Sequence, residues 1–219
     1  TRAITSWAWD FGDTQTSTAQ NPQHIYQNAG TYAVTLTVSN QIGSDTETKS
    51  GYVVVSPVTH TLTYTAGSGG SITGTSPQTV NHGANGSSVT AVPNSNYHFV
   101  QWSDGSIANP RTDTNVTADV TVAASFAINT YTLTYTAGSN GSITGTSPQT
   151  VNHGASGSAV TAVPDANYHF VQWSDGSIVN PRTDTNVTAD VTVAASFAIN
   201  TYTLTYTAGS NGSITGTSP

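Results

Sequence analysis

The chain has 219 residues, of which 35% are hydrophobic and only 7% are charged, and its formal net charge at pH 7 is −7. The absence of cysteine excludes thiol catalysis, disulfide bonds and thiolate metal sites. Four basic residues against eleven acidic ones cannot neutralise a run of phosphates, so we expect no nucleic-acid partner. No apolar run approaches the roughly 20 residues of a membrane span, so we also expect no membrane-spanning segment.

Two stretches near the start of the chain alternate between apolar and polar residues. Trp7, Trp9 and Phe11 share one side of the first stretch, and Tyr32 and Leu36 share one side of the second. A period of two is typical of a half-buried strand, so two amphipathic strands can pack over an indole core. We therefore expect these five side chains to form the core of a small β-sandwich.

Four motifs follow one another in this first segment: WDFGD at residues 9–13, NPQHIY at 21–26, GTYAVTLTVSNQIG at 30–43 and VVV at 53–55. In order and spacing they resemble a PKD (polycystic kidney disease) domain, an immunoglobulin-like β-sandwich common in secreted proteins. That family usually has further strands before its WDFGD element, whereas here only Thr1–Ser6 precede the first strand. The resemblance therefore implies a partial PKD sandwich over residues 1–57 whose N-terminal strands are missing.

An internal repeat of 71 residues follows. The string TLTYTAGS begins at Thr61, at Thr132 and at Thr203, and between residues 62 and 130 the first copy differs from the second at only six positions. Self-similarity at a fixed period is the signature of a repeat architecture. The sequence therefore divides into residues 1–57, a first repeat at 58–130, a second repeat at 131–201 and the truncated start of a third at 202–219.

Each repeat carries the same period-two pattern. Tyr131, Leu133 and Tyr135 alternate with threonines, and NYHFVQW predicts a strand that is apolar on both faces. Clusters of Gly, Asn and Pro between these segments predict turns, and only residues 155–164 leave room for a helical turn. We expect the cores of the repeats to consist of aromatic side chains, namely Phe99, Trp102 and Phe126 in the first repeat and Phe170, Trp173 and Phe197 in the second.

Five elements of the repeat occur in a fixed order: the opening YTLTY, then SNGS, VNHG, NYHFVQW and the closing VTADVTVAASFA. Together they resemble the internalin B-repeat (Listeria-Bacteroides repeat), in the divergent form found in bacterial surface proteins. The resemblance implies a small β-grasp-like fold, with a helix that residues 154–164 encode weakly, and it carries over no catalytic residue. The sequence thus predicts a mainly all-β chain, a partial PKD β-sandwich followed by tandem β-grasp-like repeats.

Few residues suggest catalysis or metal binding. Asp10 and Asp13 come nearest to a paired carboxylate, but their position favours hydrogen bonds within a turn; calcium is the alternative, although no ligand-dense loop surrounds them. The six histidines show neither HxH nor HxxxH spacing. Two histidines in each repeat could share a metal with Asp104 or Asp175 across strands, but structural hydrogen bonding is favoured. Since no GxSxG motif is present either, we expect no cofactor and no enzymatic activity.

Two functions of different classes remain open. Near-identical tandem units set length and multiply weak contacts, whereas an active site is needed only once. This favours a non-enzymatic spacer or fibre segment of a repetitive protein at the bacterial cell surface. The alternative is an adhesin module in which exposed Trp or Tyr rings bind glycans or a host protein, or an accessory region of a secreted hydrolase. In each case we expect an extracellular location.

The end of the sequence suggests contacts with other chains. Tyr202, Leu204 and Tyr206 form an alternating strand with too little chain after it to bury its apolar side. Strand edges with exposed apolar faces recruit other chains. We therefore expect neighbouring copies of the array, or filament subunits, to be partners at these three residues.

Overall fold

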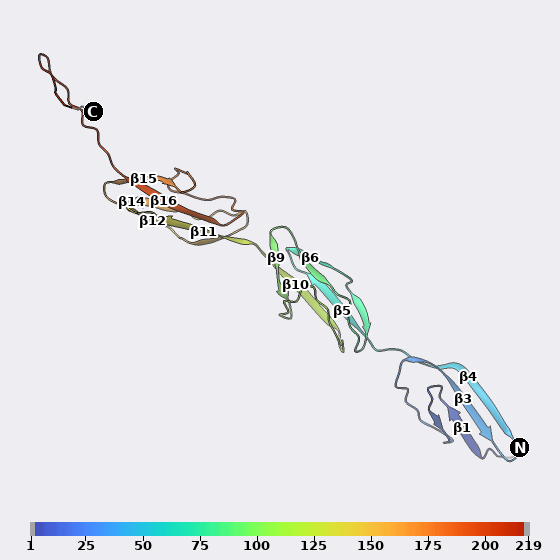
Figure 1. Cartoon of the computed structure of the whole chain (residues 1–219). Helices are drawn as coiled ribbons and strands as arrows, with labels where there is room; N and C mark the ends of the chain where they lie inside the picture. The colour runs from blue at the N-terminus through green and yellow to red at the C-terminus, as the bar shows by residue number, and fades with distance from the viewer. Residues whose placement is uncertain (1–2, 217–219) are drawn as a thin grey trace. The chain divides into compact units, whose positions relative to one another are not determined.

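The computed structural model describes residues 3–216, so residues 1–2 of the predicted first segment and residues 217–219 of the predicted last one lie outside the described part (Figure 1). Residues 3–216 form strands, turns and irregular segments and contain no helix. The predicted all-β class is therefore confirmed. Among these residues there is accordingly no helix long and apolar enough to cross a membrane.

The first segment forms one antiparallel sheet with the strand order β2-β1-β3-β4. Its two faces differ in chemistry. On one face threonines of β3 and β4 bond in pairs, with Oγ1 atoms 2.9 Å apart for both Thr35 with Thr48 and Thr37 with Thr46. The opposite face carries Trp9 directly opposite Leu36. The strands are β1 (Ser6–Asp10), β2 (Thr16–Ser17), β3 (Gly30–Ser39) and β4 (Ser44–Val55).

The connection between β2 and β3 supplies the small core of this segment. The ring of Phe11, which is 7% exposed, stacks on His24 with 4.1 Å between ring centroids, and Tyr26 stacks on Tyr32 at 4.3 Å. The indole N–H of Trp9 donates a hydrogen bond to the connection at 3.1 Å. The connection thus covers one end of the apolar face, while Trp9 itself stays half-buried.

Each repeat consists of a four-stranded mixed sheet and a two-stranded sheet (Figure 1). The four-stranded sheets have the order β7-β5-β10-β9 in the first repeat and β13-β11-β16-β15 in the second. The first and last strands of each repeat are neighbours and run parallel. The strands are β5 (Thr59–Ala66), β6 (Gly70–Thr73), β7 (Gln78–Asn81), β8 (Thr90–Pro93), β9 (Tyr97–Trp102), β10 (Val120–Ile128), β11 (Thr130–Ala137), β12 (Gly141–Thr144), β13 (Gln149–Asn152), β14 (Thr161–Pro164), β15 (Tyr168–Trp173) and β16 (Val191–Ile199).

The helical turn for which the sequence leaves room at residues 155–164 does not form, and strand β14 occupies the end of that range. The side chain of Gln149 hydrogen-bonds to the backbone of this loop. Its Nε2 donates to the Ser158 carbonyl at 2.9 Å, and its Oε1 accepts from the Ser158 N–H at 2.6 Å. Gly157 lies so close to the core that a Cβ there would be 2.6 Å from Leu133 Cδ1. Tertiary contacts therefore hold the loop in an extended path.

The largest fully buried side chain in each repeat is a tryptophan. Trp102 and Trp173 are 0% exposed, and each meets a buried tyrosine, Tyr64 or Tyr135, edge to face with 6.0 Å between ring centroids. The four predicted phenylalanines are half-buried and contact one another in pairs beside this centre. These pairs are Phe99 with Phe126 and Phe170 with Phe197.

Residues 201–219 have the same sequence as residues 130–148, which form β11 and β12 in the second repeat. The described part of the copy, residues 201–216, nevertheless contains no strand. Its apolar side chains are exposed, Tyr202 by 82%, Leu204 by 67% and Tyr206 by 57%. Since strand β11 is held by β13 on one side and β16 on the other, the same residues without such neighbours do not form a strand.

Candidate functional site

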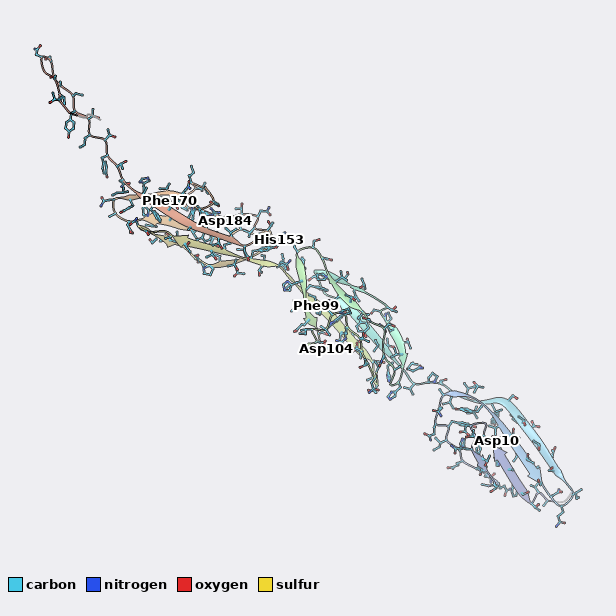
Figure 2. All side chains as sticks on the ribbon, in the orientation of Figure 1. Asp10, Phe99, Asp104, His153, Phe170 and Asp184 are labelled. Atoms are coloured by element: carbon cyan, nitrogen blue, oxygen red, sulfur yellow. The ribbon has the colours of Figure 1, made fainter. Side chains whose placement is uncertain are left out.

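A buried arginine lies at the centre of a polar cluster in each repeat. In the second repeat the backbone of Arg182 pairs with Val160 through two hydrogen bonds, of 2.8 and 2.9 Å. Its guanidinium Nη1 donates to Asp175 at 2.7 Å, and Nη2 and Nε donate to the two carboxylate oxygens of Asp184 at 2.6 and 2.8 Å. The guanidinium carbon lies 5.6 Å from the Trp173 ring centroid. Figure 2 labels Asp184 in this repeat and Asp104, the counterpart of Asp175, in the first.

A tyrosine completes the cluster. The Tyr135 hydroxyl donates to Asp184 at 2.7 Å. The hydrogen bond from Arg182 holds the pKa of Asp184 below its ordinary value, while burial raises the pKa of Tyr135, helped by the adjacent carboxylate. At neutral pH the carboxylate is therefore charged and the phenol keeps its proton.

The first repeat contains the same cluster. Arg111 donates to Asp104 at 2.7 Å and to Asp113 at 2.6 and 2.9 Å, and Tyr64 donates to Asp113 at 2.7 Å. Its guanidinium carbon again lies 5.6 Å from the ring centroid of Trp102. We call these two groups of residues the arginine clusters.

The arginine clusters are suited to holding structure and not to catalysis. A general acid or base needs a pKa near the working pH, whereas the pKa values of these tyrosines and arginines are raised and those of the aspartates are lowered. Every buried side-chain nitrogen and oxygen in the described residues has a hydrogen-bond partner. The two arginines are not among the functional residues that the sequence pattern predicts. A signal for them is nevertheless present, because Arg111 and Arg182 are two of only four basic residues and recur at the 71-residue period.

The predicted carboxylate pair is used within its own turn. Asp10 accepts a hydrogen bond from the Gly12 N–H at 2.9 Å, and Asp13 accepts one from the Gln15 N–H at 3.2 Å. The second oxygen of Asp13 lies 2.7 Å from His24 Nε2. No group of three or more His, Asp or Glu side chains suited to a metal ion occurs within residues 3–216.

The histidines on the NYHFVQW strands do not meet Asp104 or Asp175, because both aspartates bind the arginines. His98 and His169 instead pair with Asn129 and Asn200, each with 3.0 Å between ring nitrogen and amide oxygen. A further pair, His60 and His82, lies on the first repeat with ring nitrogens 3.0 Å apart.

The apolar face of the first sheet carries a hollow of about 220 Å³ beside Trp9. We call it the Trp9 hollow. Tyr52, at its rim, is 65% exposed, and the ammonium of Lys49 lies 5.9 Å from its ring centroid. Of the residues expected to form this core, Trp7, Trp9, Tyr32 and Leu36 are half-buried and Phe11 is buried. The remaining lining residues are Val34, Leu36 and Glu47.

Comparison with known families matches both parts of the chain. Residues 1–55 match the PKD domain, and residues 60–130 and 131–201 each match the divergent InlB B-repeat domain. Both resemblances noted in the sequence are therefore confirmed.

Individual curated proteins match short stretches of the chain. Collagenase ColQ1 of Bacillus cereus (strain Q1) is 41% identical over 51 residues, which are 23% of this chain and 5% of that protein. Pre-pro-metalloprotease PrtV of Vibrio cholerae serotype O1 (strain M66-2) is 54% identical over 44 residues, 20% of this chain and 5% of that protein. The chain thus spans a small fraction of the relatives that it matches. No solved structure matches the chain.

The arginine clusters should make the stability of both repeats depend on pH. The pKa values of Asp113 and Asp184 are lower in the folded state than the unfolded value of about 3.9, so their stabilisation is fully present above about pH 5. It is lost as the pH falls through the folded-state pKa values. We expect the melting temperature of both repeats to fall steeply below about pH 4, as measured by circular dichroism between pH 7 and pH 2.

The matched variant is Asp184→Asn, which removes the titrating group from the second repeat and leaves the first as an internal reference. Its second repeat should be less stable at pH 7 but should lose less stability on acidification. Melting curves that shift with pH by the same amount in the variant and the parent would contradict this assignment.

Proposed function

The chain belongs to the family of divergent InlB B-repeat domains, and from that premise we propose that it is a non-enzymatic structural segment of a bacterial cell-surface or extracellular protein. In this role the repeats act as a spacer that carries mechanical load along the chain.

The observation that supports a load-bearing role is the pairing of the first and last strands of each repeat. In the second repeat β11 and β16 run parallel, with Leu133 opposite Val191 and Ala137 opposite Ala195. The chain enters the repeat at the start of β11 and leaves it at the end of β16. Tension on the two ends therefore pulls these neighbouring strands in opposite directions along their length. The interstrand hydrogen bonds then bear the load together and do not open one at a time.

Composition and repetition support the same role. The two full repeats differ at six positions between residues 62 and 130, so an array of them adds length by interchangeable units. Arg111 and Arg182 are each 8% exposed, which hides two of the chain's four basic residues from trypsin-like proteases. Such resistance suits a segment exposed outside the cell.

Single-molecule force spectroscopy tests this proposal. The chain lacks cysteine, so engineered cysteines can serve as unique attachment points. A Thr130→Cys, Thr201→Cys variant loads β11 and β16 in shear, whereas a Ser139→Cys, Thr201→Cys variant pulls both strands from the same end. We expect a clearly higher unfolding force in the first geometry. Equal forces in the two geometries would contradict the load-bearing role.

A second candidate function is an adhesin or accessory binding module, and the Trp9 hollow favours it. Exposed aromatic rings stack on sugars and on extended peptides, and Tyr52 offers such a ring beside Trp9. The segment with this hollow is the part of the chain that matches a collagenase and a metalloprotease. We propose on this basis that the first segment holds glycans or fibrous protein near a partner domain.

A glycan array and a collagen-binding assay with the whole chain test the second candidate. If the hollow binds a ligand, Tyr52→Ala should weaken binding about tenfold while leaving the fold intact, because this side chain is largely exposed. The control is Val54→Ala, an equally exposed residue of the same strand outside the hollow. The Trp9 hollow is not a binding site if both variants retain binding or if neither assay detects any binding.

A further inference from the structure

We propose that His60 and His82 form a binding site for one late first-row divalent transition metal ion, such as Cu²⁺, Ni²⁺ or Zn²⁺, on the first repeat. The site goes beyond the structural role of the repeats, and the second repeat lacks it.

The backbone ladder brings the two imidazoles together. His60 on β5 lies directly opposite Val80 on β7. His82 follows Val80 by two residues and therefore projects on the same side of the sheet as His60. The His82 N–H donates to the Val58 carbonyl at 2.8 Å, which fixes the backbone just beyond the end of β7. The sheet register therefore places the two histidines side by side on one face.

The distance between the ring nitrogens suits a shared metal ion. Nε2 of His60 and Nδ1 of His82 are 3.0 Å apart. Two imidazole nitrogens bound to one metal at about 2.0–2.1 Å, with an angle of about 95–110° between the bonds, lie about 3.0–3.4 Å apart. Without metal a proton on one of these nitrogens bridges the pair. Metal binding moves that proton to the other nitrogen of the same ring, so both ligands bind as neutral imidazoles.

The carboxylate of Asp119 lies near the first ligand, within electrostatic range of His60 but beyond hydrogen-bond distance. Its Oδ1 lies 3.7 Å from His60 Nδ1 and also accepts the Thr61 N–H at 2.8 Å, which holds the carboxylate in place. A carboxylate on this side favours the proton on Nδ1 and leaves the lone pair of Nε2 directed at His82. The arrangement of carboxylate, histidine and metal recurs in protein metal sites, where the carboxylate orients the ring and raises its basicity.

The donor set determines which ions bind. Two imidazoles suit Cu²⁺, Ni²⁺ and Zn²⁺, whereas Ca²⁺ and Mg²⁺ require oxygen ligands. Because no third His, Asp or Glu ligand joins the pair in the described residues, water must fill the remaining coordination positions. Affinity should therefore follow the general order for divalent ions, with Cu²⁺ bound most tightly.

The second repeat provides a natural comparison. Tyr131 occupies the place of His60, and its hydroxyl lies 3.4 Å from His153 Nδ1. Asp190 accepts the Thr132 N–H at 2.8 Å, just as Asp119 accepts that of Thr61. A neutral phenol does not replace an imidazole as a ligand for these ions. One substitution between otherwise matching positions thus separates a binding repeat from a non-binding one.

The test is titration of the untagged full chain with Cu²⁺, Ni²⁺ and Zn²⁺ at pH 7.5, followed by calorimetry and by electron paramagnetic resonance of the Cu²⁺ complex. We expect one ion per chain, nitrogen coupling in the Cu²⁺ spectrum and no competition by excess Ca²⁺. His60→Tyr, which copies the second repeat, should abolish binding without loss of melting temperature. Asp119→Asn should weaken binding about tenfold.

Two further variants complete the test. His153→Ala, in the second repeat, should leave binding unchanged, and Tyr131→His should raise the stoichiometry to two ions per chain. The proposal is overturned if the parent chain binds no more metal than His60→Tyr. It is also overturned if His153→Ala removes the bound ion or Tyr131→His adds none.

Discussion

Each repeat depends on one guanidinium buried beneath a tryptophan ring and held by two carboxylates. Burying a charge without partners costs several kcal/mol, but Arg182 donates to Asp175 and twice to Asp184, and Tyr135 binds the same carboxylate. These groups come from the opening strand of the repeat and from the long connection between β15 and β16. The cluster therefore ties residues that are distant in sequence into one unit, and its counterpart does the same in the first repeat.

The cluster matters because the connection that it anchors has no regular structure of its own. Residues 174–190 form no strand, and backbone bonds such as that from the Gly157 N–H to the Asp184 carbonyl hold them against a second irregular loop. Small domains without disulfides or metal staples have limited apolar burial with which to order such segments. In each repeat the arginine cluster, whose buried polar atoms all have hydrogen-bond partners, helps to order this connection. Its charged groups are all engaged in these structural contacts, so none of them is available for chemistry.

Much of this architecture follows from local sequence pattern, and the remainder follows from contacts between distant residues. Period-two alternation predicted the strands, and two tryptophans in otherwise polar repeats are fully buried in the structure. The loop at residues 155–160 is not helical, because side chains outside it, Gln149 on β13 and Leu133 on β11, hold its path. The pairing of His60 with His82 depends on strand register, which no spacing within the sequence reveals. The conformation of residues 201–216 also depends on distant contacts, because the same sequence forms strand β11 between two neighbouring strands but forms no strand here.

The most direct measurement is differential scanning calorimetry of the whole chain with Arg182→Ala, compared with Arg111→Ala. If the arginine clusters hold each repeat together, removing the guanidinium leaves the mostly buried carboxylate of Asp184 or Asp113 without its cation and should cost about 3–5 kcal/mol in that repeat. We expect Arg182→Ala to lower the melting transition of the second repeat and to leave that of the first unchanged, and we expect the reverse for Arg111→Ala. Variants that melt like the parent would contradict this role of the arginine clusters.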